Sequence, residues 1–108
     1  MSNYSDVIVD ENPVLNEKTA ADLAEFFSAL SDTSRIRIIS ALTHGELNVS
    51  AIAEAVGISE SAVSHQLRGL RQMHLVRARK DGRQVFYSID DDHVTDLFQR
   101  GLAHIQHN

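Results

Sequence analysis

The feature that most limits how this chain can fold is a change in the spacing of its apolar residues near residue 75. Before that point, apolar side chains recur every three or four positions, which is the period of an amphipathic helix. Over about residues 75–89 they alternate with polar residues around an Asp81-Gly82 pair, and such a pair is a strong signal for a tight hairpin turn. The pattern therefore predicts a mainly α-helical domain that carries one small β-hairpin.

Helices are expected on both sides of the hairpin, over about residues 18–31, 32–44, 49–56, 59–74 and 90–106. Thr19 followed by Asp22 resembles a capping box for the first of them. Between the third and fourth, Gly57 permits a positive φ and Ser59 is a good N-cap, so a sharp turn is expected there. Residues 1–16 hold the only proline among mixed polar residues, which indicates a flexible arm before one domain over 17–108.

Composition agrees with a small folded protein. A length of 108 residues fits one domain, and an apolar fraction of 43% is enough for a core. A domain of this size buries only about two thirds of its surface, so pairing with another chain would stabilise it. The chain has no cysteine, which excludes disulfides and thiolate metal sites. Without a signal-peptide pattern or an apolar run near the roughly 20 residues that span a bilayer, a soluble cytoplasmic protein is expected.

The charges are unevenly distributed along the chain. The net charge is −5, yet residues 68–83 hold six basic residues and one acidic residue, which makes that segment +5 and the remainder −10. A basic patch on an acidic body is typical of proteins that bind nucleic acid, although a solvated charged surface would look the same.

The basic segment coincides with a recognisable order of elements. A helix, a glycine-containing turn, a second helix and a hairpin with a basic tip make up a winged helix-turn-helix. The helix over 59–74 has short polar side chains on its outer face, so its backbone can approach the major groove. We expect this helix to contact DNA and the hairpin to contact phosphates, the alternative being an exposed polar helix in any α-rich domain. The residues concerned are Ser61, Ser64, His65, Gln66 and Arg68 on the helix, and Arg77, Arg79, Lys80 and Arg83 on the hairpin.

Several of these segments resemble one known family. The stretches Leu30-Ser-Asp-Thr-Ser-Arg and Ser59-Glu-Ser-Ala-Val-Ser-His-Gln-Leu, followed by Gly82-Arg-Gln-Val-Phe-Tyr, are similar to the ArsR/SmtB family of metal-sensing repressors over roughly residues 20–107. The resemblance implies a homodimer formed through the first and last helices, a palindromic operator, and loss of DNA affinity when an inducer binds. It also places DNA contacts on Glu60, Ser61, Ser64 and His65. Glu60 departs from the pattern, because a carboxylate faces phosphate poorly; it either accepts from cytosine N4 or supports the helix N-terminus.

The last expected helix carries candidate metal ligands at both ends, Asp91 and His93 near its start and His104 and His107 near its end. Eleven residues separate the two middle histidines, about 16 Å along a helix, whereas metal–ligand bonds are only about 2 Å. One helix cannot bring both ends to one ion, but two antiparallel helices related by a two-fold axis can. Symmetry would then give two sites per dimer.

The donor set narrows the choice of metal. Three imidazoles and one carboxylate suit tetrahedral Zn(II), with Co(II) as a close mimic, while Ni(II) prefers more ligands. The same four positions match the zinc-sensing branch of the family that the chain resembles. That resemblance implies that the family's second, cysteine-based site is absent here. A zinc hydrolase is disfavoured, because four protein ligands leave no open position for water.

Two further histidines lie in the expected DNA-binding region, His65 and His74. The first is on the outer helix face and is assigned to DNA. The second ends that helix, where unpaired carbonyls could accept a hydrogen bond from the second ring nitrogen of metal-bound His104. We therefore expect a metal-responsive repressor with coupling through His104 and His74, the alternatives being a nickel- or cobalt-responsive repressor and a metal-independent one.

Overall fold

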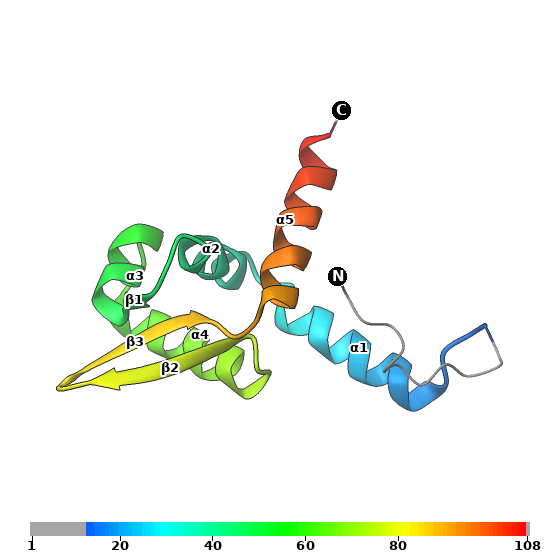
Figure 1. Cartoon of the computed structure of the whole chain (residues 1–108), viewed down its shortest axis with the longest axis horizontal. Coiled ribbons are helices and arrows are strands. Elements are labelled where there is room, and N and C mark those ends of the chain that lie inside the picture. Colours follow the sequence, from blue (N-terminus) through cyan, green and yellow to red (C-terminus); the bar gives the residue numbers. More distant parts are fainter. Residues whose placement is uncertain (1–12, 108) are drawn as a thin grey trace.

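A short three-stranded sheet and three helices form the body of the protein, and two further helices flank it (Figure 1). The structure is a computed structural model that describes residues 13–107. In chain order the elements are α1 Glu17–Ala29, α2 Thr33–Leu42, β1 Leu47–Asn48, α3 Val49–Val56, α4 Glu60–Gln72, β2 Val76–Asp81, β3 Gln84–Ile89 and α5 Asp92–Gln106. This order confirms the predicted winged helix-turn-helix fold. The expected arm over 1–16 lies largely outside the described residues.

Side-chain caps begin the helices. The expected cap Ser59 accepts a hydrogen bond from the backbone N–H three positions ahead, so this prediction is confirmed. Asp32 and Asn48 cap α2 and α3 in the same way. The predicted capping box of Thr19 and Asp22 is wrong. Asn16 Oδ1 instead accepts from the Thr19 backbone N–H at 2.8 Å, since asparagine caps at least as well as threonine and lies one turn earlier.

The sheet has β3 at its centre and β1 and β2 on either side, both antiparallel to it. The hairpin is confirmed, but its turn is displaced by one residue from the expected Asp81-Gly82 pair. Asp81 pairs with Gln84, so Gly82 and Arg83 form the turn, with a φ of +63° at Gly82. A glycine at the first of two turn residues supplies the positive φ that a tight hairpin needs. Strand β1 was not predicted, because two residues are too few to show an alternating pattern.

The core lies where α2, α3 and α4 meet the start of the hairpin. Its centre has no exposed surface, and the five residues with 0% exposure that represent it are Ile38, Ile52, Val63, Leu70 and Leu75. The flanking helices contribute little to it, since α1 adds Ala29 and α5 adds Val94. No helix in residues 13–107 is long and apolar enough to cross a membrane.

The two flanking helices leave an apolar groove open between them. Its sides come from α1, α2 and α5, and Figure 1 shows α1 and α5 extending away from the body. Phe27 remains 50% exposed and Ile105 73% exposed in this groove. Exposed apolar surface of this kind on a single chain is typical of an interface. The residues that line it include Phe27, Leu30, Ile39, Phe98, Leu102 and Ile105.

Candidate nucleic-acid interface and metal-ligating residues

Helix α4 has one buried face and one polar face. Val63, Leu67 and Leu70 anchor it to the core at helical spacing. Gly57, in the left-handed region with a φ of +79°, ends α3 and sets the turn that leads into α4. The polar face is exposed, and it carries Glu60, Ser61, Ser64, His65 and Arg68. These are five of the predicted DNA contacts, and the fold presents them together on one helix.

Gln66 differs from its neighbours on α4, because its side chain is half-buried and is held by α2. Its Oε1 accepts a hydrogen bond from Arg35 Nε at 2.7 Å, and its Nε2 lies 3.4 Å from Asp32 Oδ2. Among the residues that we expected on the DNA-binding face, this one is turned toward the body of the protein.

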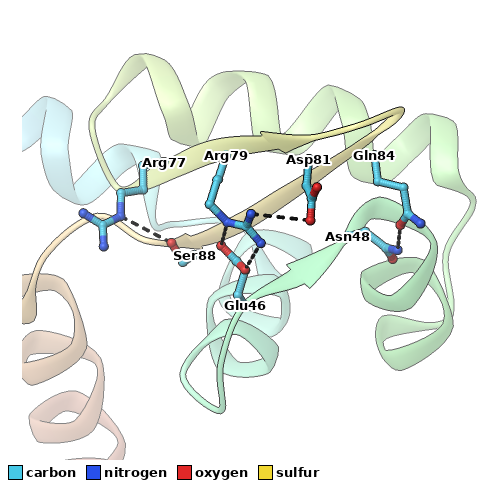
Figure 2. Close-up of polar contacts among 7 residues, drawn as sticks. All are labelled: Glu46, Asn48, Arg77, Arg79, Asp81, Gln84 and Ser88. Carbon is cyan, nitrogen blue, oxygen red and sulfur yellow. Dashed lines mark hydrogen bonds and ion pairs between the residues drawn. The ribbon is translucent and has the colours of Figure 1, made fainter.

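The hairpin, or wing, carries the remaining predicted phosphate contacts. Lys80 and Arg83 are exposed at its tip, and their side chains form no hydrogen bond or ion pair with any other residue of the range 13–107. Arg77 Nε donates weakly to Ser88 Oγ at 3.4 Å across the two strands (Figure 2). Three of the four predicted wing cations are therefore available to meet phosphate with little rearrangement.

Arg79, the fourth wing cation, forms an ion pair with a carboxylate of the protein itself. Its guanidinium donates two hydrogen bonds to Glu46, with distances of 3.0 and 2.7 Å (Figure 2). The guanidinium also lies over the ring of Phe86. These hydrogen bonds lower the pKa of the Glu46 carboxyl and raise the pKa of the Arg79 guanidinium. Beside this pair, Asn48 Nδ2 donates to Gln84 Oε1 at 2.6 Å, so β1 and the loop before it are tied to the wing at two points.

A shallow hollow runs between α4 and the sheet. It is lined by Ser64, Arg68, Arg71 and Tyr87, among others. Arg71 and Tyr87 were not among the predicted DNA contacts. The spacing of Ser64, Arg68 and Arg71 at i, i+4 and i+7 was the signal that could have placed Arg71 on the same helix face.

The four candidate metal ligands fall into two pairs on α5. At its start, Asp91 Oδ1 caps the helix by accepting from the backbone N–H of His93 at 2.8 Å, and His93 Nδ1 lies 3.3 Å from the same oxygen. At its end, the backbone N–H of His107 donates to the His104 carbonyl. All four side chains are exposed. In the part of the chain that the structure describes, no three acidic or histidine side chains gather closely enough to hold a metal.

His74 occupies an uncommon backbone conformation after α4. Its φ is +59°, and it is the only non-glycine residue with a positive φ in the described range. The turn has the hydrogen bonds of a Schellman motif, from His74 N to Arg71 O and from Leu75 N to Leu70 O. Two of the carbonyls at this helix end are thus already paired, and Figure 1 shows the C-terminal half of α5 well away from α4.

Comparisons with known proteins agree with this architecture. The family model described as bacterial regulatory protein, arsR family, matches residues 32–78. A transcriptional repressor SmtB homolog from Synechocystis is 50% identical over 93 residues, which cover 86% of this chain and 70% of that protein. A cadmium resistance transcriptional regulatory protein CadC homolog from Staphylococcus aureus is 37% identical over 91 residues, which cover 83% and 75%.

A solved structure extends the agreement to three dimensions. It is the homodimeric winged helix-turn-helix DNA-binding domain Mb0332 from Mycobacterium bovis, a possible ArsR-family regulator. That domain has 30% sequence identity and a TM-score of 0.77, with 88% of this chain and 90% of that chain covered. The chain therefore belongs to the ArsR family of bacterial regulatory proteins, and it is a DNA-binding transcriptional regulator and not an enzyme.

Proposed function

We propose that this protein is a metal-responsive repressor, which binds a palindromic operator as a homodimer and is released when Zn(II) or Co(II) binds to its last helix. The observation that carries the proposal is the placement of two ligand pairs at opposite ends of α5, beside an open apolar groove. Neither pair completes a tetrahedral site alone, and a second copy of the chain could complete both.

The exposed polar face of α4 is assigned to the major groove. Short side chains at Ser61 and Ser64 let the helix approach the base edges, where His65 and Arg68 can reach. Arg77, Lys80 and Arg83 of the wing would position the dimer by binding phosphates. Glu60 follows the Ser59 cap in the first turn of α4, where its negative carboxylate would be stabilised by the positive end of the helix dipole. Gln66 and Arg79 could add contacts only after leaving their present partners.

The homodimer is assigned to the groove between α1 and α5. A two-fold axis through this groove would set two α5 helices side by side and antiparallel. Apolar side chains such as Phe27 and Leu102 would then lose their contact with water, which stabilises association by about 25 cal/mol per Å². The Mycobacterium bovis relative is described as homodimeric, which supports a homodimer for this chain too.

The ligands that we assign are Asp91 and His93 of one copy with His104 and His107 of the other. These residues fit a metal, because His93 Nδ1 already lies 3.3 Å from Asp91 Oδ1 and all four ligand side chains are exposed. Three nitrogen donors and one carboxylate suit Zn(II) best. The cadmium regulator is a relative, but this chain has no cysteine and so lacks the thiolates that soft metals prefer.

Release of DNA requires that the two conformations of the dimer differ in metal affinity. Metal held across two copies would favour one arrangement of the α5 helices, and thereby one separation of the α4 helices. Reading successive major grooves requires a separation of about 34–36 Å. We assign the coupling to His104, whose second ring nitrogen needs an acceptor, and to a carbonyl at the end of α4 near His74.

Fluorescence anisotropy of a labelled duplex tests the proposal, with the duplex selected from random-sequence DNA by the metal-free protein. At fixed salt, Zn(II) should weaken binding by about 5–150-fold, which is the usual range of coupling between two sites. Equilibrium dialysis should find two Zn(II) per dimer. His93→Ala should abolish both effects, and His44→Ala, which changes an exposed histidine on another element, should change neither.

The outcomes separate the alternatives. Binding of DNA without any metal effect would leave a metal-independent repressor. Release by Ni(II) but not by Zn(II) would mean the nickel-responsive alternative. His104→Asn should still bind Zn(II) but lose the response; a variant that binds Zn(II) and keeps its full response would refute coupling through His104.

A further inference from the structure

One arginine that belongs neither to the wing nor to the candidate metal ligands joins three helices. Arg35, in the first turn of α2, is half-buried. Its Nη1 donates to the carbonyl of Ala29, the last residue of α1, at 3.1 Å, and its Nε donates to Gln66 Oε1 on α4 at 2.7 Å. The guanidinium thus bonds both the end of α1 and the middle of α4.

Both the oxygen and the nitrogen of the Gln66 side-chain amide have a partner on α2 or at its N-cap. Its oxygen accepts from Arg35, and its nitrogen faces Asp32 Oδ2 at 3.4 Å. The same carboxylate oxygen caps α2 by accepting from the Arg35 backbone N–H at 3.1 Å. Because the amide has one acceptor end and one donor end, these partners fix its orientation as well as its place.

Arg35 also lies close to a glycine of α4. A Cβ atom built at Gly69, one turn after Gln66, would lie 3.4 Å from Arg35 Nη2, which is ordinary van der Waals contact. The guanidinium therefore lies beside the bare backbone of α4, and only a side chain longer than that of alanine would have to displace it. We call Arg35, Asp32, Gln66 and the Ala29 carbonyl the α2–α4 clasp.

We propose that the α2–α4 clasp positions the DNA-binding helix relative to the dimer-forming helix α1, and that Gln66 acts in DNA recognition through Arg35 and not by touching a base. The clasp starts on α1 two residues after Phe27, which lines the apolar groove, and ends on the helix that carries Ser64. The proposal rests on the assignment of α4 to the major groove. Arg35 and Gln66 are positioning residues, because their side chains hydrogen-bond to each other, to Ala29 and to Asp32 within the protein.

A double-mutant cycle on metal-free protein tests this role, with Arg35→Met and Gln66→Ala singly and together. The selected duplex and an unrelated duplex of equal length serve as probes in anisotropy titrations over several salt concentrations. We expect each single variant to bind the selected duplex about tenfold more weakly, and the double variant to lose no more than a single one, as residues of one network do. Binding to the unrelated duplex and the salt dependence should stay unchanged, because no phosphate contact is lost.

Further variants separate positioning from folding. Arg35→Lys keeps the charge but cannot bond Gln66 and Ala29 together, so it should behave like Arg35→Met. Arg37→Met removes an exposed arginine from the same helix and should change nothing. Urea unfolding and sedimentation of each variant should show a folded dimer. If Arg35→Met does not fold, Arg35→Lys and Gln66→Ala carry the test.

Two results would overturn the proposal. Additive losses in the cycle would mean that the two residues act separately, and a loss with Gln66→Ala but not with the Arg35 variants would mean that Gln66 touches DNA itself. Ser64→Ala distinguishes these from a failure of the underlying assignment. If Ser64→Ala leaves binding to the selected duplex unchanged, it is the placement of α4 in the major groove that fails.

Discussion

At the scale of single residues, His74 ends α4 in a strained backbone conformation that lowers the stability of the protein. A side chain with a Cβ atom is disfavoured at its φ of +59°, where glycine is the usual residue. His74→Gly should raise the free energy of unfolding by about 0.5–1 kcal/mol, because relief of the left-handed conformation outweighs the greater entropy of the unfolded glycine chain. Urea unfolding of the metal-free protein measures this difference.

The matched control is Gly57→Ala at the end of α3. Its φ of +79° lies in the same region, so the change should destabilise the protein by about 1 kcal/mol or more. A His74→Gly variant that is less stable than the parent would mean that the imidazole makes a contribution larger than the strain. If the coupling uses only backbone carbonyls near His74, the glycine variant should also keep its response to Zn(II).

Single residues also show what the sequence could predict. The caps Asp32 and Ser59 were predictable, because a cap bonds a backbone group three positions away. Gln66 was assigned to DNA because a long polar side chain on the expected DNA-binding helix can reach farther than a serine. Its partner Arg35 lies 31 positions earlier in the chain, and helical spacing carries no information about that contact.

At the scale of elements, the pair of Glu46 and Arg79 ties the wing to the loop before β1. The lowered pKa of Glu46 means that its contribution to stability is complete above the ordinary value of 4.5 and is lost as the pH falls through the lower folded value. We expect the NMR signal of Arg79 Nε–H to be constant from pH 7 to about 5 and to change below about 4.5. Glu46→Gln should remove this acid transition.

Glu54→Gln serves as the control for the wing, since it changes an exposed carboxylate on α3 and leaves the ion pair intact. It should preserve the pH profile of Arg79. A profile that is the same in the parent and in Glu46→Gln would mean that the ion pair does not form in solution.

The same ion pair predicts a difference between two wing arginines. Arg83→Ala should reduce the salt slope of DNA binding by about one, which is the loss of one phosphate contact. Arg79→Ala should reduce it less, because Glu46 already neutralises that guanidinium. Anisotropy titrations between low and high salt measure both slopes, and an equal reduction would mean that Arg79 leaves Glu46 for a phosphate.

Most elements were predictable because each has its own period, from the helical spacing of α4 to the alternation in β3. Strand β1 was not, since Leu47 and Asn48 become a strand only by pairing with Tyr87 and Phe86. The wing cations were predicted as one group, yet Arg79 differs from the rest. Its partner Glu46 lies 33 positions away, and only the folded sheet brings the two together.

At the scale of the whole molecule, the proposed metal site and the proposed dimer are one prediction. The two ligand pairs lie at opposite ends of α5, so a monomer cannot offer all four ligands to one ion. The sequence could predict this, because helix length alone separates the pairs. It could not predict how α1 and α5 extend from the body and leave an apolar groove open between them.

Phe27→Glu should therefore abolish tight metal binding although it changes no ligand. Phe27 lines the groove and is half-exposed in the single chain, so the variant should fold, but a carboxylate buried at the interface should weaken dimerisation by about a hundredfold or more. Sedimentation would show that the variant is monomeric. Competition with a chelator would show that its affinity for Zn(II) is lost. Ser28→Glu, next to it on α1 and outside the groove lining, should keep both properties. A monomeric Phe27→Glu protein that still binds Zn(II) as tightly as the parent would show that the site belongs to one chain.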